Sequence, residues 1–393
     1  MVCGDKMKYE LATCTWGDEE LAAIREVVES GNFTMGGKVA EFERRFADYL
    51  GARHCVMVNS GSSANLLMTA ALFFRRERRL ERGDEVLVPA VSWATTYTPL
   101  AQYGLRLRFV DIDLNTLNFD LNALERALSP RTRAVLAVNL LGNSNDYGRI
   151  SQMLAGRGID LLEDNCESLG GEWEGRKLGT IGVMGTFSCY FSHHISTMEG
   201  GVVATDDDEL YHILLSLRSH GWTRNLPDDN LVCSKGSDPF EESFRFVLPG
   251  YNVRPVEMSG AVGICQLEKL PRFVETRRRN AERFLACFGD DRRFIVQREL
   301  GRSSWFGFSL ILRDESVARG KVVAKLRDSG IETRPVVAGN FARKEVVKWF
   351  DCEVPAELPN ADIVDARGFF VGNNPEDLSP QIDYLKEVLD GVV

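Results

Sequence analysis

The chain has 393 residues, of which 44% are hydrophobic and 26% are charged, and its formal net charge at pH 7 is -10. A chain of this length can bury a large core and suggests two or three domains, while its acidity argues against nucleic acid or an anionic membrane as the main partner. No apolar run approaches the ~20 residues that span a membrane, and residues 1–10 lack the plan of a signal peptide, so we expect a cytoplasmic protein.

Nine cysteines are scattered along the chain, and no two of them are closer than eleven positions. Metal and iron–sulfur sites usually need at least one close pair, such as C-x-x-C. The spacing therefore predicts no metal site, and we interpret all nine as reduced, buried cysteines.

The first predicted elements are two helices, over residues 18–30 and 38–50, separated by a glycine-rich turn. A short buried strand over residues 54–58 follows, then a turn at Asn59–Ser62 and a long helix from Ser63. The amino end of a helix carries unpaired amide donors, so the sequence SGSSAN could cradle a phosphate group at this point. A serine-rich helix cap without a ligand would give the same pattern.

Strands alternate with helices in the next part of the chain. The pattern predicts strands over residues 85–93, 105–113 and 134–142, and a helix over residues 121–128. This alternation predicts an α/β fold with a mostly parallel sheet covered on both faces. Trp93 ends the first of these strands, where an aromatic ring either packs at the rim or stacks on a flat ligand.

Two acidic residues follow a further strand, in the sequence IDLLEDNCESLGG. Asp164 lies at the end of the apolar run, and Glu167 lies three residues later. The apolar residues before Asp164 argue against an ordinary surface acid.

Residues 185–205, GTFSCYFSHHISTMEGGVVAT, predict a strand, a polar loop and a second strand. The loop holds His193 and His194. Imidazole titrates near neutral pH, so two histidines in a glycine-closed loop suit proton transfer. One solvated and one packed histidine would give the same pattern, and both interpretations stay open on the loop alone.

This loop resembles the cofactor loop of the sugar aminotransferase branch of the fold-type I pyridoxal phosphate (PLP) enzymes, in which a lysine precedes an acidic-Gly-Gly turn. Here the turn is Glu199-Gly200-Gly201, and His193 occupies the lysine position. No lysine occurs between Lys177 and Lys235. The exchange of lysine for histidine marks a small subgroup of this branch, the nucleotide-sugar 3-dehydratases.

The resemblance extends from about residue 31 to residue 335. It implies an aspartate aminotransferase-like fold, with a large PLP-binding domain over residues 1–269 and a small C-terminal α/β domain over residues 270–393. In the small domain the sequence predicts a helix from about residue 270, a strand near residues 304–312 and a helix over residues 322–328.

The resemblance also implies roles for the candidate residues. Gly61, Ser62 and Ser188 would hold the cofactor phosphate, and Trp93 would stack on the cofactor ring. Asp164 would keep the ring nitrogen protonated, so that the ring can accept electrons.

Catalytic roles would fall to His193, Glu167 and His220, although a helix-capping role for His220 stays open. His193 would take a proton from the cofactor methylene carbon, which leads to loss of the substrate hydroxyl.

Residues 244–263 resemble the segment that the dimeric relatives exchange between subunits. We therefore expect a homodimer, in which Phe244 and Asn252 help to bind the cofactor of the partner subunit. Substrate-binding residues implied by the resemblance are Arg224, Arg254, Glu332 and Arg334.

The implied activity is removal of the C3 hydroxyl of a nucleotide-linked 4-keto-6-deoxyhexose, with L-glutamate as amino donor and PLP and pyridoxamine phosphate as cofactor forms. The product would be a 3,6-dideoxy-4-keto sugar. The overall match favours GDP-4-keto-6-deoxy-D-mannose as substrate and a place in colitose and lipopolysaccharide O-antigen synthesis.

Two alternative functions remain, a nucleotide-sugar 4-aminotransferase and a catalytically silent regulator of the same fold. A lysine at position 193 would favour the aminotransferase, because a lysine amine binds PLP covalently and helps to return nitrogen to the sugar. Histidine cannot form that link but can act as base and acid in turn. Retention of Trp93, Asp164, Glu167 and Ser188 together argues against the silent regulator.

Overall fold

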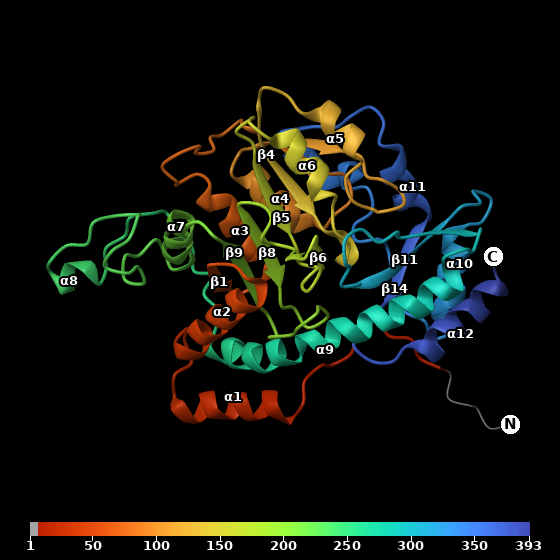
Figure 1. Ribbon diagram of the computed structural model, residues 1–393, viewed down its shortest axis with the longest axis horizontal. Helices are drawn as coiled ribbons and strands as arrows, with labels where there is room; N and C mark the ends of the chain where they lie inside the picture. The colour runs from red at the N-terminus through yellow and green to blue at the C-terminus, as the bar shows by residue number, and fades with distance from the viewer. Residues whose placement is uncertain (1–6) are drawn as a thin grey trace.

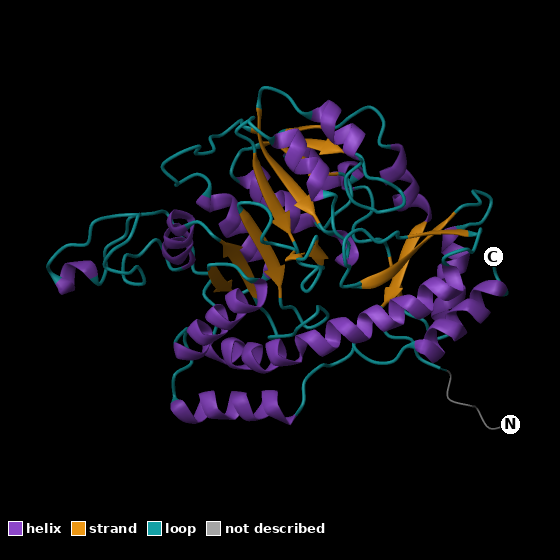
Figure 2. Cartoon of the chain, viewed as in Figure 1, coloured by secondary structure: helices purple, strands orange, loops and turns teal. Residues whose placement is uncertain are grey.

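The computed structural model describes residues 7–393 (Figures 1 and 2). Its strands are β1 (His54–Val58), β2 (Glu85–Pro89), β3 (Arg106–Val110), β4 (Thr132–Val138), β5 (Asp160–Asp164), β6 (Glu172–Trp173), β7 (Arg176–Lys177), β8 (Met184–Ser188), β9 (Gly201–Thr205), β10 (Phe294–Val296), β11 (Gly307–Leu312), β12 (Thr333–Arg334), β13 (Cys352–Glu353) and β14 (Gly368–Gly372). Its α-helices are α1 (Asp18–Ser30), α2 (Gly37–Leu50), α3 (Gly61–Ala71), α4 (Ala94–Gln102), α5 (Leu121–Ala127), α6 (Tyr147–Leu154), α7 (Asp208–Arg218), α8 (Pro239–Glu242), α9 (Glu257–Phe288), α10 (Arg319–Asp328), α11 (Pro359–Arg367) and α12 (Ser379–Asp390).

The large sheet has eight strands in the order β1-β9-β8-β5-β4-β2-β3-β13. From β8 to β13 all neighbouring strands are parallel, whereas β9 runs antiparallel to both β1 and β8. The predicted α/β fold with a mostly parallel sheet is therefore confirmed.

Helices cover both faces of this sheet, as the buried residues of β1 illustrate. Val56 and Val58 pack in a core that α3, α4 and α7 cover, while Cys55 and Met57 pack on the opposite face against α2 and α9. Successive side chains of a strand point to opposite faces, so one apolar strand can serve both layers. Further along the second face, α5 and α6 cover the sheet (Figure 1).

A smaller antiparallel sheet, β10-β11-β14-β12, lies beside the large one and packs with α10 and α12 around its own core (Figure 2). The long helix α9 runs along both units (Figure 1). The predicted domain boundary at residue 270 falls inside α9, and β13 from the C-terminal part pairs with β3 of the large sheet. Helix α9 and the pairing of β13 with β3 join the two parts, so the division into residues 1–269 and 270–393 stays a prediction.

Several predicted element bounds need adjustment. The helix over residues 18–30 has the predicted bounds, but the helix expected from Ser63 begins at Gly61, with Ser60 as its N-cap. The helix expected from about residue 270 begins at Glu257. None of the helices within residues 7–393 is long and apolar enough to cross a membrane.

Candidate active site

A cavity of about 710 Å³ lies where the large sheet meets the small unit. Its walls come from the starts of α3 and α4, the carboxyl ends of β4, β5 and β8, the loop that follows β8, and the residues around β12. The edge outside the carboxyl ends of parallel strands is where open α/β sheets bind their ligands. Eight of the sequence-predicted site residues line it: Gly61, Ser62, Trp93, Asp164, Glu167, Ser188, His193 and Arg334.

Asp164 is the last residue of β5, and its side chain is only 4% exposed. Its Oδ2 accepts hydrogen bonds from Asn65 Nδ2 (2.9 Å) and Thr96 Oγ1 (2.8 Å), and its Oδ1 accepts one from the backbone N–H of Cys166 (3.1 Å). Three donors fix the position of the carboxylate. The carboxylate is thus suited to hold a proton on the nitrogen of a flat heterocycle.

The amino end of α3 faces the same cavity. Ser60 caps the helix by accepting a hydrogen bond from the backbone N–H of Ser63 (3.1 Å), and Ser62 Oγ donates to Thr95 Oγ1 (3.0 Å). A Cβ atom at Gly61 would lie 2.7 Å from the Cβ of Ser188, so only glycine lets the helix start this close to the end of β8. The result is a recess of amide and hydroxyl groups that suits a phosphate.

Trp93 lies directly before α4 and lines the cavity with 59% of its surface exposed. A large indole left open beside a buried carboxylate can cover the face of a flat ring.

Glu167 lies in the cavity wall beyond β5. Its Oε2 accepts a hydrogen bond from the backbone N–H of Leu141 (3.0 Å), and burial raises the pKa of its carboxyl to about 7. Near neutral pH this carboxyl therefore both holds and releases a proton, which makes it a candidate acid or base.

The two adjacent histidines have different environments. His193 lines the cavity, and its ring lies 5.2 Å from the ring of Phe306, measured between centroids. His194 is fully buried, does not line the cavity, and places its Nε2 3.3 Å from the backbone oxygen of Ser304. The structure therefore presents one imidazole to the cavity and keeps the other in the core.

Burial is the main reason why the pKa of each imidazole lies below its usual value. Burial and then the charge of Arg277 and Arg334 lower the pKa of His193 to about 4, and burial lowers the pKa of His194 well below its usual value. A neutral imidazole can accept a proton, so His193 has the protonation state of a general base.

Five other predicted site residues are not among the residues that line the cavity; they belong to residues 219–256, which include the arm that projects beyond α7 and carries α8 (Figure 1). Three of them lie around the ring of Trp222. Between ring centroids, Trp222 lies 4.7 Å from His220 and 6.1 Å from Phe244, and the guanidinium carbon of Arg254 lies 5.7 Å from the Trp222 centroid. Arg254 also donates to Asn252 Oδ1 (3.1 Å), while Arg224 is exposed. Within one chain these five residues do not line the cavity, so their roles stay predictions.

Glu332 also lies outside the cavity lining. Its Oε2 accepts a hydrogen bond from the backbone N–H of Leu11 (3.1 Å), so it ties the N-terminal segment to the small unit. Its predicted contact with substrate stays a prediction.

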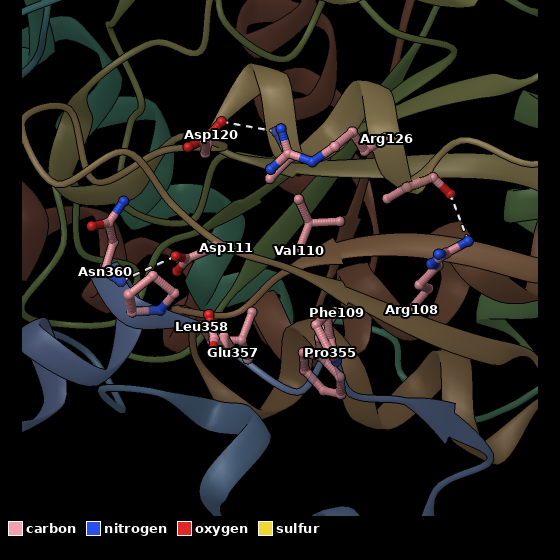
Figure 3. A pocket seen from close by; sticks show the side chains of 13 residues that line it. Arg108, Phe109, Val110, Asp111, Asp120, Arg126, Pro355, Glu357, Leu358 and Asn360 are labelled. Atoms are coloured by element: carbon pink, nitrogen blue, oxygen red, sulfur yellow. Dashed lines mark hydrogen bonds between the residues drawn. The ribbon is translucent and has the colours of Figure 1, made fainter.

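A second cavity, of about 390 Å³, lies between β3, α5 and the residues before α11 (Figure 3). Its charged groups serve the fold. Asp111 accepts the backbone N–H groups of Asn360 (3.0 Å) and Ala361 (2.9 Å), and Arg108 donates to the backbone oxygen of Ala127 (2.9 Å). None of the sequence-predicted site residues lines this cavity.

Sequence reasoning missed several residues of the larger cavity. Asn65 and Thr96 hold Asp164 but belong to helices 99 and 68 positions earlier in the chain, and Phe306 comes from the small unit. Asn65 lies one turn into the helix after the phosphate recess, which is the local signal that could have identified it.

Residues 15–384 match the model of the DegT/DnrJ/EryC1/StrS aminotransferase family. The chain is 56% identical over 386 residues to a GDP-4-keto-6-deoxy-D-mannose 3-dehydratase of Yersinia pseudotuberculosis, covering 98% of each chain. It also resembles a crystal structure of GDP-4-keto-6-deoxymannose-3-dehydratase with bound GDP-perosamine, a histidine-to-asparagine mutant, with TM-score 0.96 and 56% identity, covering 97% of this chain and 100% of that one. A structure of such a dehydratase with a trapped PLP-glutamate geminal diamine matches with TM-score 0.96 and 55% identity over 97% and 100% of the two chains.

Proposed function

Because this chain belongs to the DegT/DnrJ/EryC1/StrS aminotransferase family, we propose that it is a PLP-dependent dehydratase that removes the C3 hydroxyl of GDP-4-keto-6-deoxy-D-mannose. The observation that carries the proposal is the identity of residue 193: a histidine faces the cavity, and no lysine is among the lining residues in the part of the chain that the structure describes. Relatives that are 55–56% identical carry the same dehydratase name, and their structures hold a GDP-sugar or a PLP-glutamate adduct.

The cavity residues fit the cofactor. The first-turn amides of α3, with Ser62 and Ser188, would bind its phosphate, and Trp93 would cover the face of its ring. Asp164, fixed by Asn65 and Thr96, would hold the proton on its ring nitrogen. When bound, the cofactor supplies an electron sink for the reaction, and L-glutamate supplies the amino group that loads it.

The proton transfers fall to His193. Its Nδ1 is buried and has no hydrogen-bond partner among residues 7–393, so we assign proton transfer to Nε2. The neutral imidazole accepts a proton and returns it later, while Phe306 covers one side of the ring. Glu167, with its pKa near 7, can give a proton to the departing C3 hydroxyl, which leaves as water. Arg334 lines the cavity as a cation for an anionic group of glutamate or nucleotide.

We also propose that the working enzyme is a homodimer. The arm leaves large apolar side chains in solvent: Phe244 is 68% exposed, Phe246 55% and Phe240 82%. Exposed aromatic groups on a projecting segment are typical of an interface. A second copy would cover them, and would bring Phe244, Asn252 and Arg254 toward its cavity.

A cytoplasmic location fits the unpaired state of all eight cysteines in the described part of the chain. The prediction that the cysteines are buried is wrong for most of them, because only Cys55 and Cys189 are buried among these eight. The 3,6-dideoxy-4-keto product would serve the synthesis of a dideoxysugar such as colitose for a lipopolysaccharide O-antigen.

The deciding experiment incubates the purified protein with PLP, L-glutamate and a panel of GDP-, CDP- and dTDP-linked 4-keto-6-deoxy sugars, followed by mass analysis. The proposal requires loss of one oxygen from the sugar of the GDP substrate, with release of ammonia. Accumulation of an amino sugar would instead establish a 4-aminotransferase, and no product with any sugar would favour the silent regulator.

A further inference from the structure

The loop between β8 and β9, which carries His193, has few hydrogen bonds of its own. It is closed at its base, where the backbone N–H of Cys189 donates to the backbone oxygen of Gly200 (2.9 Å). In the described part of the chain, the backbone of residues 191–196 hydrogen-bonds outside the loop only at Ser196. The ring of His193 has no hydrogen-bond partner at Nδ1, so its place depends on packing and on the path of the loop backbone.

Ser196 lies three residues after His193, is 5% exposed, and has both of its backbone groups held by distant side chains. Its N–H donates to Oε1 of Gln266 on α9 (3.1 Å), and its backbone oxygen accepts a hydrogen bond from Nε1 of Trp16, directly before the N-cap of α1 (3.0 Å). Helix α1 lies beside α9, so the two side chains come from neighbouring elements (Figure 1). Buried backbone groups without partners are costly, so these two bonds favour one path of the loop.

The orientation of the Gln266 amide is fixed by its other contacts. Gln266 is fully buried, and its Nε2 donates to Glu20 Oε1 (2.7 Å) and to the backbone oxygen of Thr15 (3.1 Å). An ionised carboxylate can only accept, so Glu20, which Lys269 Nζ contacts at 2.8 Å, determines which end of the amide faces it. The amide oxygen is left to face Ser196, and it also accepts a hydrogen bond from Thr15 Oγ1 (2.7 Å).

We propose that Gln266 and Trp16 are positioning residues for the dehydration: they hold Ser196 by its two backbone groups and thereby fix the loop that presents His193 to the cavity. This inference rests on the proposed function of His193. Neither residue lines the cavity, so both act through the loop. The effect can be large, because a displacement of about 1 Å at a reacting group can cost roughly 10²-fold in rate.

The groups proposed to bind the cofactor are held by separate contacts. Asp164 is fixed by Asn65 and Thr96, and the phosphate recess is formed by the first turn of α3, which Ser60 caps. Loss of the contacts at Ser196 should therefore displace the imidazole and leave the cofactor-binding groups in place. This separation distinguishes a positioning role from a general contribution to the stability of the fold.

The first test is hydrogen exchange of the cofactor-free full chain, measured by mass spectrometry on peptides that cover residues 189–201. Trp16→Phe removes the indole N–H and keeps an aromatic ring, while Gln266→Met keeps the length of the side chain and removes the amide. Each variant should raise exchange in this loop about 5- to 10-fold, the effect of one lost hydrogen bond, and leave the β5 peptide unchanged. The control Cys14→Ser, at an exposed position of the same N-terminal segment, should not alter exchange in the loop.

The second test is the single-turnover rate of dehydration. Trp16→Phe should slow it about 10-fold, while the affinity for PLP should change less than about twofold. In the His193→Asn background, Trp16→Phe should cause no further loss, because no imidazole remains to be displaced. A general effect on stability would instead lower the rate by the same factor in both backgrounds.

Unchanged loop exchange in Trp16→Phe and Gln266→Met would overturn the proposal, as would an equal loss of rate from Trp16→Phe in both backgrounds. If Gln266→Met does not fold, Trp16→Phe alone decides both tests. The exchange measurement needs no turnover. If the variants loosen the loop as expected but the wild type dehydrates no sugar, the proposed function fails while the attachment of the loop at Ser196 stands.

Discussion

Replacing His193 with asparagine removes the imidazole that faces the cavity and keeps a side chain of similar polarity. Asparagine cannot accept and return a proton, so we expect dehydration to fall by about 10²–10⁴-fold, the usual contribution of general acid–base catalysis. The loss should appear in single-turnover rates with L-glutamate and GDP-4-keto-6-deoxy-D-mannose. The matched control is His194→Asn, which changes the adjacent, fully buried imidazole and its contact with Ser304.

The two variants should separate in stability as well as in rate. His194→Asn alters a buried packing position and should destabilise the fold by about 1–3 kcal/mol while slowing turnover much less. His193 has a folded-state pKa of about 4 against an ordinary value of 6.5, so the wild type loses stability as pH falls from 6.5 toward 4. In urea unfolding, His193→Asn should not show this part of the fall in the free energy of unfolding at low pH, which amounts to at most about 3 kcal/mol. Full activity in His193→Asn, with loss in His194→Asn, would refute the assignment.

Three further predictions concern the cofactor and the acids. Borohydride treatment of the PLP-loaded protein should attach no cofactor to the chain, because no lysine lines the cavity among the described residues; a modified lysine peptide in the mass spectrum would contradict this. Asp164→Asn should weaken PLP binding about 10- to 100-fold in a spectroscopic titration, since it loses a charge-assisted hydrogen bond worth about 1.5–3 kcal/mol, and unchanged affinity would refute the ring-nitrogen role. The folded-state pKa of Glu167 is about 7, above the 4.5 of a free carboxyl, so wild-type stability should fall by at most about 3 kcal/mol as pH rises from 4.5 through 7. In Glu167→Gln, the free energy of unfolding measured with urea should depend less on pH between 4.5 and 7. An unchanged pH dependence would show that another group titrates.

The parts of the fold that were predictable from sequence are those with strong local patterns. Helix α1 has the predicted bounds, and the strands on either side of the 190–200 loop lie where the apolar runs place them. Asp164 was found because it ends an apolar run, and such a run in an α/β chain predicts a buried strand that stops at the ligand edge of the sheet.

The first half of α9 was missed for a physical reason. Its sequence contains Gly260 and Gly263, which weaken a helix pattern when read alone. In the fold, a Cβ at Gly260 would lie 2.6 Å from the backbone nitrogen of Val39, so glycine lets α2 and α9 pack closely. A tertiary contact thus offsets a low local propensity, and no window of sequence contains both partners.

The local pattern of the loop leaves His193 and His194 equivalent, and only the family resemblance, through its register against Glu199, favours His193. The two imidazoles are identical in type and adjacent in the chain, and the predicted turn allowed either to face a ligand. What separates them comes from about 110 residues later, where the backbone oxygen of Ser304 lies beside His194 and the ring of Phe306 packs against both. His194 is thereby held in the core, which leaves His193 at the cavity with a buried, unpartnered Nδ1. The small unit therefore does more than close the cavity, because its contacts determine which of two equivalent bases is available for chemistry.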